Sequence, residues 1–194
     1  MYVLYMQTLK PELKQEILRT AKELFFLRGF SGTTMRLVAD GVQVSVSNLY
    51  KYFNDKDDLL EAVVGEYARR FKGSMLMELD HDDAEEFRQE RWENMARGLA
   101  KAINADHKSF FILMNQARGC AYEGYKQEVS DMVRARIIAS ARGIDGYGFL
   151  AEVLALNLID AIASIARRYG GTDEVSVVLL ELFRYHMAGL GALD

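Results

Sequence analysis

Cysteine, proline and histidine are scarce in this 194-residue chain. The single cysteine, Cys120, excludes a disulfide within the chain and is typical of a reducing compartment, so we expect a cytoplasmic protein. The single proline, Pro11, suits the first position of a helix, where no backbone N–H is needed. His81, His107 and His186 share no spacing that would let a helix present them to one metal ion.

Recognisable catalytic signatures are also missing. The sequence has no GxSxG, no phosphate-binding glycine loop, no HExxH and no CxxC. His81 with Asp82 and Asp83 could bind a cation weakly, but a solvated linker explains this run better. We therefore expect no enzyme, with no catalytic residue, no metal site and no cofactor.

Neither a signal peptide nor a membrane span is expected. The opening MYVLYMQTLK has no basic region before its apolar residues, and we interpret it as a loose arm, or as an upstream extension if Met6 is the true start. The long apolar run at 149–166 is interrupted by Glu152, Asn157 and Asp160.

Charge is distributed unevenly along the chain, whose formal net charge is −4. Residues 1–56 hold 8 Lys and Arg against 5 Asp and Glu, a net of +3, and residues 57–194 hold the remaining 16 against 23, a net of −7. A basic head on an acidic body favours a protein that contacts DNA at one end. Chance asymmetry is the competing explanation. Half of the residues are apolar, which is ample for a soluble core.

The stretch from Thr33 to Lys56 predicts two short helices joined by a tight turn. Thr33 and Thr34 can cap the first helix, Gly41 interrupts its pattern, and Ser45 can cap the second. In that second helix small polar side chains point away from the apolar ones. Such a helix suits the major groove of DNA, where bulky side chains would hold it off.

The segment from about residue 14 to residue 67 resembles the N-terminal domain of the tetracycline-repressor (TetR) family of bacterial transcription regulators. The run of spaced matches covers about a quarter of the chain; the rest matches only in length and helical character. The matching residues are Ile17, Leu18, Ala21, Leu24, Phe25, Gly29, Phe30, Thr33, Thr34, Val38, Ala39, Val44, Ser45, Leu49, Tyr50, Tyr52, Phe53, Lys56, Leu59 and Leu60.

This resemblance implies an all-α fold of about nine helices. Residues 1–56 would form a three-helix helix-turn-helix DNA-binding domain, and residues 57–194 a helical effector-binding and dimerisation domain. The helix at 57–79 would connect the two. Long apolar patterns without a convincing strand agree with an all-helical chain.

Three positions depart from the family pattern. Gln43 stands where the family usually has the turn glycine, so we expect it in a left-handed conformation at a cost of about 1 kcal/mol. Ser47 replaces a frequent glycine in the recognition helix, and Val46 takes a position that is often polar or basic. No operator sequence can therefore be transferred from the family to this chain.

The predicted DNA contacts lie in and beside the helix-turn-helix. Tyr50, Tyr52 and Lys56, with the caps Thr33 and Thr34, are expected to bind phosphates. Base edges are expected to meet Arg36, Ser47 and Asn48, and Val46 a thymine methyl. Lys51 completes the set. A dimer would place two recognition helices one DNA turn apart, about 34–36 Å, or a multiple of it, and so read a near-palindromic duplex.

Residues 84–142 should contain any effector cavity, because aromatic and methionine side chains concentrate there. Ordinary core packing is the competing explanation for each of them. Asn115, Gln116, Arg118 and Asp160 are candidate polar anchors, and equally candidate surface or capping groups. The predicted ligand-binding residues are Phe87, Trp92, Met95, Phe110, Phe111, Met114, Tyr122 and Tyr125.

The last two predicted helices, at about 148–169 and 173–190, are apolar almost all round. A helix apolar on every face needs cover on every face, and pairing with the same helices of a second copy would supply it. The resembled family dimerises that way; a core pair in a monomer is the alternative. The predicted interface residues are Val153, Leu154, Leu158, Ile162, Leu179, Leu182 and Phe183.

The sequence thus predicts a homodimeric regulator of transcription, most economically a repressor that a small hydrophobic or aromatic molecule releases from DNA. One rival is an architectural or cell-division protein of the same fold without a small-molecule inducer. The other is a carrier of hydrophobic ligands whose DNA head is vestigial.

Overall fold

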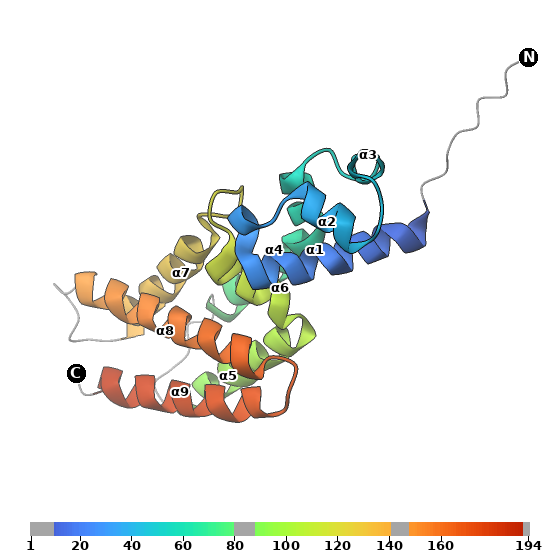
Figure 1. Cartoon of the computed structure of the whole chain (residues 1–194). Helices are drawn as coiled ribbons and strands as arrows, with labels where there is room; N and C mark the ends of the chain where they lie inside the picture. Colours follow the sequence, from blue (N-terminus) through green and yellow to red (C-terminus); the bar gives the residue numbers. More distant parts are fainter. Residues whose placement is uncertain (1–9, 80–87, 141–147, 192–194) are drawn as a thin grey trace, which may run out of the picture.

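A computed structural model describes residues 10–79, 88–140 and 148–191. Helices make up these ranges, and no strand occurs within them (Figure 1), which confirms the all-α prediction. The elements are α1 (Pro11–Gly32), α2 (Met35–Gly41), α3 (Val46–Leu49), α4 (Lys56–Leu79), α5 (Arg88–Ala105), α6 (His107–Phe111), the π-helical turn η2 (Ile112–Gln116), α7 (Tyr125–Ser140), α8 (Gly148–Tyr169) and α9 (Glu174–Gly191).

The first three helices form the head, and their boundaries follow the predicted signals. Pro11 opens α1, and Gly29 ends its regular part because its backbone angles (φ 72°, ψ 172°) are accessible almost only to glycine. α2 packs close against α1 at Gly41, where an added Cβ would lie 2.7 Å from Thr20 Cγ2. The three helices bury one apolar face each.

α4 runs from the head into the body and packs against α1, α6 and η2. α7 packs on α8, α5 packs on α9, and α8 and α9 lie side by side. One hydrophobic core extends through head and body, from Ile17 and Leu49 to Ile162 and Leu179. Within the described residues, head and body therefore share one packed core, and a movement of the body can be transmitted to the head.

Helix α6 and the turn η2 sit between the head and the rest of the body. Asp106 caps α6 by accepting a hydrogen bond from the Ser109 backbone N–H at 3.1 Å. Along α6, Phe110 and Phe111 are both buried but point to different neighbours. The Phe110 ring packs against Phe71 of α4, and the Phe111 ring packs against Phe26 of α1.

By length and composition alone, α8 could cross a membrane, with a mean hydropathy of 1.9 over its most apolar window. Such a helix is also typical of a soluble core. Ala151, Ala155 and Ala163 are fully buried along one face of α8, and this face packs within the chain.

Candidate DNA interface and ligand cavity

The recognition helix α3 is short and capped at its start. The Ser45 hydroxyl accepts a hydrogen bond from the Asn48 backbone N–H at 3.2 Å, and Thr34 caps α2 in the same way through the Leu37 N–H. Between the two helices Gln43 adopts φ 56°, the left-handed conformation predicted from the missing turn glycine. Caps and turn together fix the angle at which α3 leaves the head.

The outer side of α3 presents small side chains. Leu49 is fully buried and anchors the helix, whereas Ser47 is exposed and Asn48 is half-buried. Val46 is also half-buried and packs against the core, so it has less freedom to approach a thymine methyl than a solvent-facing side chain. The assignment of Ser47 and Asn48 to base edges stays a prediction. Ser47 is exposed and Asn48 partly exposed, as a contact with a base requires.

Cationic and aromatic groups flank this helix. Arg36 on α2 is 83% exposed, and its Nε lies 3.9 Å from Asp40, an ion pair too exposed to hold it firmly. Tyr50 is 50% exposed, and Lys51 is exposed as well. The Tyr52 hydroxyl accepts a hydrogen bond from the Lys10 backbone N–H at 3.0 Å, so it already ties the start of α1 to the recognition region.

One predicted phosphate contact, Thr33, is corrected by the structure, and another, Lys56, has partners within the head, so its phosphate contact stays a prediction. Thr33 is fully buried and its hydroxyl donates to the Gly29 carbonyl at 2.8 Å, so that hydroxyl does not face DNA. The Lys56 ammonium donates to the carbonyls of Phe30 (2.8 Å) and Thr33 (3.0 Å), and lies 3.9 Å from the Phe30 ring centroid. Both side chains hold the end of α1 in place. The positive charge of Lys56 is favourable there, because the helix dipole is negative at the C-terminus.

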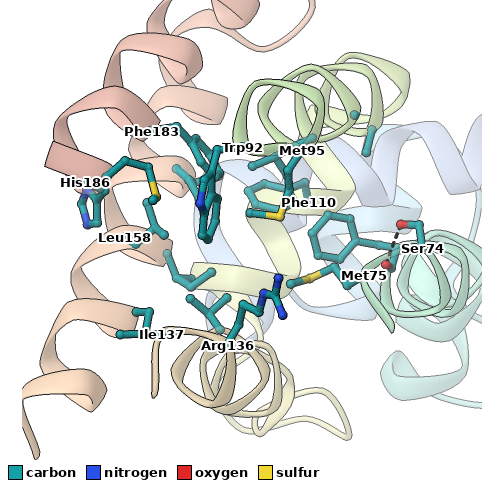
Figure 2. A pocket seen from close by; sticks show the side chains of 18 of the residues that line it. Ser74, Met75, Trp92, Met95, Phe110, Arg136, Ile137, Leu158, Phe183 and His186 are labelled. Atoms are coloured by element: carbon teal, nitrogen blue, oxygen red, sulfur yellow. Dashed lines mark hydrogen bonds between the residues drawn. The ribbon is translucent and has the colours of Figure 1, made fainter. Parts of the chain in front are cut away.

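The body contains an apolar cavity of about 150 Å³ (Figure 2). Its lining comes from α4, α5, α6, α7, α8 and α9. A dry cavity of this size accommodates a group as large as a benzene ring. The lining residues are Phe71, Ser74, Met75, Trp92, Met95, Gly98, Leu99, Ala102, Phe110, Val133, Arg136, Ile137, Leu158, Ile159, Ile162, Phe183, His186, Met187 and Leu190.

Three of the predicted ligand-binding residues, Trp92, Met95 and Phe110, line this cavity. Phe87 lies outside the described residues. The other four are absent from the lining: Phe111 and Met114 are buried elsewhere, the Tyr122 hydroxyl donates to Glu61, and the Tyr125 hydroxyl donates to the Ala68 carbonyl. None of these four borders this cavity, and their assignment to a ligand stays a prediction.

Polar side chains around the cavity are few. Ser74 donates its hydroxyl to the Phe71 carbonyl at 2.8 Å, and the Arg136 side chain extends toward the cavity from α7 (Figure 2). Burial lowers the pKa of His186, and its interaction with the backbone of Leu182 opposes that shift in part. Among the described residues, its Nδ1 is buried and has no hydrogen-bond partner of normal geometry. Nδ1 is therefore a polar atom in need of a partner.

Sequence reasoning missed His186, Met187 and Leu190 on α9. Their spacing from Phe183 (three, four and seven positions) is that of a single helix face, so the signal was present. We had assigned that face to a second copy of the chain instead.

Four predicted interface residues are buried within the single chain. Leu158, Ile162 and Phe183 line the cavity, and Leu179 is fully buried in the core. Side chains already covered by their own chain cannot form a surface for another, so these four are corrected from interface to interior. Val153, Leu154 and Leu182 are half-buried.

Polar contacts join the head to the body beside α6 and η2. Lys22 of α1 donates to Asp106 at 2.5 Å, and Lys108 pairs with Glu23. The Ser31 hydroxyl donates to the Arg118 carbonyl at 2.9 Å. Burial would raise the pKa of Asp106, but hydrogen bonds from Lys22 and Ser109 outweigh it and hold that pKa below its ordinary value.

Metal and catalytic chemistry find little support in this arrangement. Among the residues that the structure describes, no three His, Cys, Asp or Glu side chains gather where they could hold a metal ion. Cys120 is half-buried, and burial raises the pKa of its thiol, which disfavours the reactive thiolate. The two features with a geometry suited to function are the exposed recognition helix and the apolar cavity.

A capped helix-turn-helix carried on an all-helical body with an internal cavity defines a class of DNA-binding regulatory proteins. Residues 17–63 match the model of a family described as bacterial regulatory proteins, tetR family. This match covers about a quarter of the chain, namely most of the head and the start of α4.

Individual proteins are also similar to this chain. Over 59 residues the chain is 37% identical to the "Probable HTH-type transcriptional regulator YttP" of Bacillus subtilis (strain 168), a match that covers 30% of this chain and 28% of that protein. Among solved structures, a TetR-like transcriptional regulator from Rhodococcus sp. RHA1 is similar with a TM-score of 0.63 and 23% identity, over 94% of this chain and 100% of that one.

A further similar structure is AibR in complex with isovaleryl coenzyme A and operator DNA. Its TM-score is 0.59 and its identity 19%, over 88% of this chain and 97% of that one. At these identities the two solved structures show the fold alone, whereas the family model matches residues 17–63.

Proposed function

We propose that this protein is a sequence-specific, DNA-binding transcriptional regulator, a repressor that a small hydrophobic or aromatic molecule releases from its operator. One observation carries the proposal: an exposed recognition helix and an apolar cavity are connected by a single hydrophobic core. The solved complex of AibR, which has this fold, holds both operator DNA and a small molecule.

The DNA-contacting residues in this proposal are those predicted from the sequence, except Thr33 and Lys56, whose side chains point into the head. Ser47 and Asn48 read base edges, assisted by Arg36 and Val46. Thr34, Tyr50, Lys51 and Tyr52 contact phosphates and fix the register. Thr33 and Lys56 support this surface from within the head.

A homodimer is part of the proposal, with the outer sides of α8 and α9 as the contact. Val177 and Tyr185 of α9 are 62% and 76% exposed although both are large and apolar in part. They lie eight positions apart and therefore share one helix face. A second copy would cover this face and bring a second recognition helix to the same DNA.

The coupling between ligand and DNA would run along two elements. Phe71 and Met75 of α4 line the cavity, while the first residue of that helix, Lys56, binds the end of α1. Phe110 of α6 also lines the cavity, and the neighbouring Phe111 packs against α1. A ligand that shifts either helix would tilt the head.

Reciprocal binding tests this switch. A ligand releases DNA only if it binds the DNA-free arrangement more tightly, so operator DNA must weaken ligand binding by the same factor, typically about 5- to 150-fold. The measurement is ligand affinity with and without a selected operator duplex. Equal affinities would show that the bound molecule is not the inducer.

The architectural rival is the second candidate, and it would require no cavity ligand. The largely apolar cavity, with a few polar side chains in its lining, favours a ligand-binding protein. The carrier rival predicts DNA affinity that does not respond to salt, which a titration at two salt concentrations distinguishes.

A further inference from the structure

A groove on the surface of the body borders the cavity. It has a volume of about 580 Å³ and lies among α1, α4 and α5. Four residues, Phe71, Ser74, Gly98 and Ala102, line both the groove and the cavity and thus form a wall shared by the two spaces. Three of the four are among the smallest residues, which makes this shared wall thin.

Gly98 is the unusual residue in this wall. It lies inside α5. Glycine is less favourable there than alanine, because its backbone loses more conformational entropy when it becomes helical. The two usual structural reasons for a glycine are absent: its backbone is not in the left-handed region, and an added Cβ would meet no atom within 4 Å. What Gly98 provides is open space between cavity and groove.

The groove differs from the cavity in its charge. It is lined by three cations (Lys22, Arg70 and Lys101) and two carboxylates (Glu66 and Asp106), a local excess of one positive charge on an otherwise acidic body. Lys22 pairs with Asp106 and Arg70 with Glu66. Lys101 is exposed and forms no ion pair with any other described residue, so its ammonium is available to an anion.

We infer that the effector is an amphipathic anion that enters the cavity from this groove, past Gly98. Its apolar part, of about six carbons, fills the cavity beside Trp92. Its anionic group stays in the groove next to Lys101. This inference rests on the proposed ligand response and specifies the chemistry and route of the ligand.

The experiment uses Trp92, the single tryptophan of the chain, whose ring lies in the cavity wall 6.0 Å from the Phe183 ring. Its fluorescence therefore reports occupancy without any need for DNA. The probes are hexanoate, hexanoyl coenzyme A and hexan-1-ol, which share an apolar chain and differ in the group that stays outside. The carboxylate and the phosphate-bearing head distinguish two sources of the anion.

Three variants test the inference. Gly98→Leu fills the opening and should weaken binding of the anionic probes by about tenfold or more, whereas Gly98→Ala raises helix propensity without closing the gap and should bind like the wild type. Lys101→Gln should weaken hexanoate or hexanoyl coenzyme A by about three- to tenfold and leave hexan-1-ol unchanged. The Lys101→Gln comparison holds even if Gly98→Leu folds poorly.

The wild type should bind one of the anions at least about tenfold more tightly than hexan-1-ol. Equal affinity for all three probes, no response to any of them at millimolar concentration, or wild-type binding by both Gly98→Leu and Lys101→Gln would overturn the inference. Operator binding is measured on the same preparations. Intact operator binding with a failed probe response would refute this inference alone, and the reverse result would refute the proposed DNA function alone.

Discussion

At the scale of single residues, the head separates side chains that face outward from those that hold it together. Lys56 and Lys51 illustrate the difference, since both are lysines beside the recognition helix. Lys56 donates two hydrogen bonds to carbonyls at the end of α1 and covers the Phe30 ring. Lys51 is exposed, as a phosphate contact requires.

Replacing each lysine by alanine should therefore have different effects. Lys56→Ala should lower the free energy of unfolding by about 1–3 kcal/mol, because two charge-assisted hydrogen bonds are lost from a partly buried site. Lys51→Ala should leave stability nearly unchanged but weaken binding to all DNA sequences and flatten its salt dependence. Urea unfolding and DNA titrations measure both. Equal stability of the two variants would refute the assignment of Lys56.

Gln43 makes a second prediction at this scale. Its φ of 56° is unfavourable for a side chain with a Cβ, so Gln43→Gly should raise the free energy of unfolding by up to about 1 kcal/mol. Gln43→Ala is the control because it keeps the Cβ and hence the strain. Thermal or urea unfolding gives the comparison, and a glycine variant no more stable than the alanine variant would contradict it.

At the scale of elements, helix boundaries were predictable and the partners of each face were not. Caps at Thr34 and Ser45 and the break at Gly29 are local signals, and the structure has them where expected. The two neighbours Phe110 and Phe111 look alike in the sequence, yet one lines the cavity and the other packs against α1. That division depends on how helices cross, which composition and periodicity do not specify.

The same reason explains the errors on α8 and α9. Apolar periodicity showed that both helices have faces that must be buried. It could not distinguish burial within the chain itself from burial against a second copy. Leu158 and Phe183 were assigned to a partner and instead border the cavity. The boundaries of the helix-turn-helix were easier to predict because its signals lie in one contiguous segment.

The contact between α1 and α6 makes a prediction that depends on pH. The pKa of Asp106 is lowered in the folded protein, so its contribution to stability is present above the ordinary aspartate pKa of about 4 and is lost as pH falls through the folded value. Asp106→Asn should thus be less stable than wild type at neutral pH by about 1–2 kcal/mol, with a gap that narrows in acid.

A double-mutant cycle with Lys22→Met isolates the pair. The two side chains are about one quarter exposed and 2.5 Å apart, so we expect a coupling free energy of about 1 kcal/mol at neutral pH. Urea unfolding of the four proteins at neutral and acidic pH provides the measurement. A cycle without coupling at neutral pH would show that this ion pair does not hold the head to the body.

At the scale of the whole molecule, the chain has a basic head, a cavity in an acidic body, and one exposed apolar face on α9. In the dimeric regulator that we propose, the head would contact DNA, the cavity would receive the signal and the face on α9 would pair two copies. The face on α9 can be tested by itself. Val177 and Tyr185 are largely exposed, so neither is needed for the core of a single chain.

Charge placed on this face should separate the two copies. Val177→Glu with Tyr185→Glu should give a folded monomer, because two carboxylates would be buried without partners in the interface. Leu158→Lys is the contrasting variant: it introduces a charge next to the cavity and should unfold the chain. Light scattering with thermal unfolding distinguishes these outcomes. A wild type that is monomeric at micromolar concentration would refute the dimer.

The central claim is that the head reads a DNA sequence, and in vitro selection from random duplexes tests it most directly. We predict an enriched near-palindrome, bound with an affinity that falls steeply as salt rises. Asn48→Ala should lose discrimination at one position of each half-site, by about 1–3 kcal/mol, while still binding DNA. Failure to enrich any sequence, or an affinity independent of salt and of Asn48, would contradict the account.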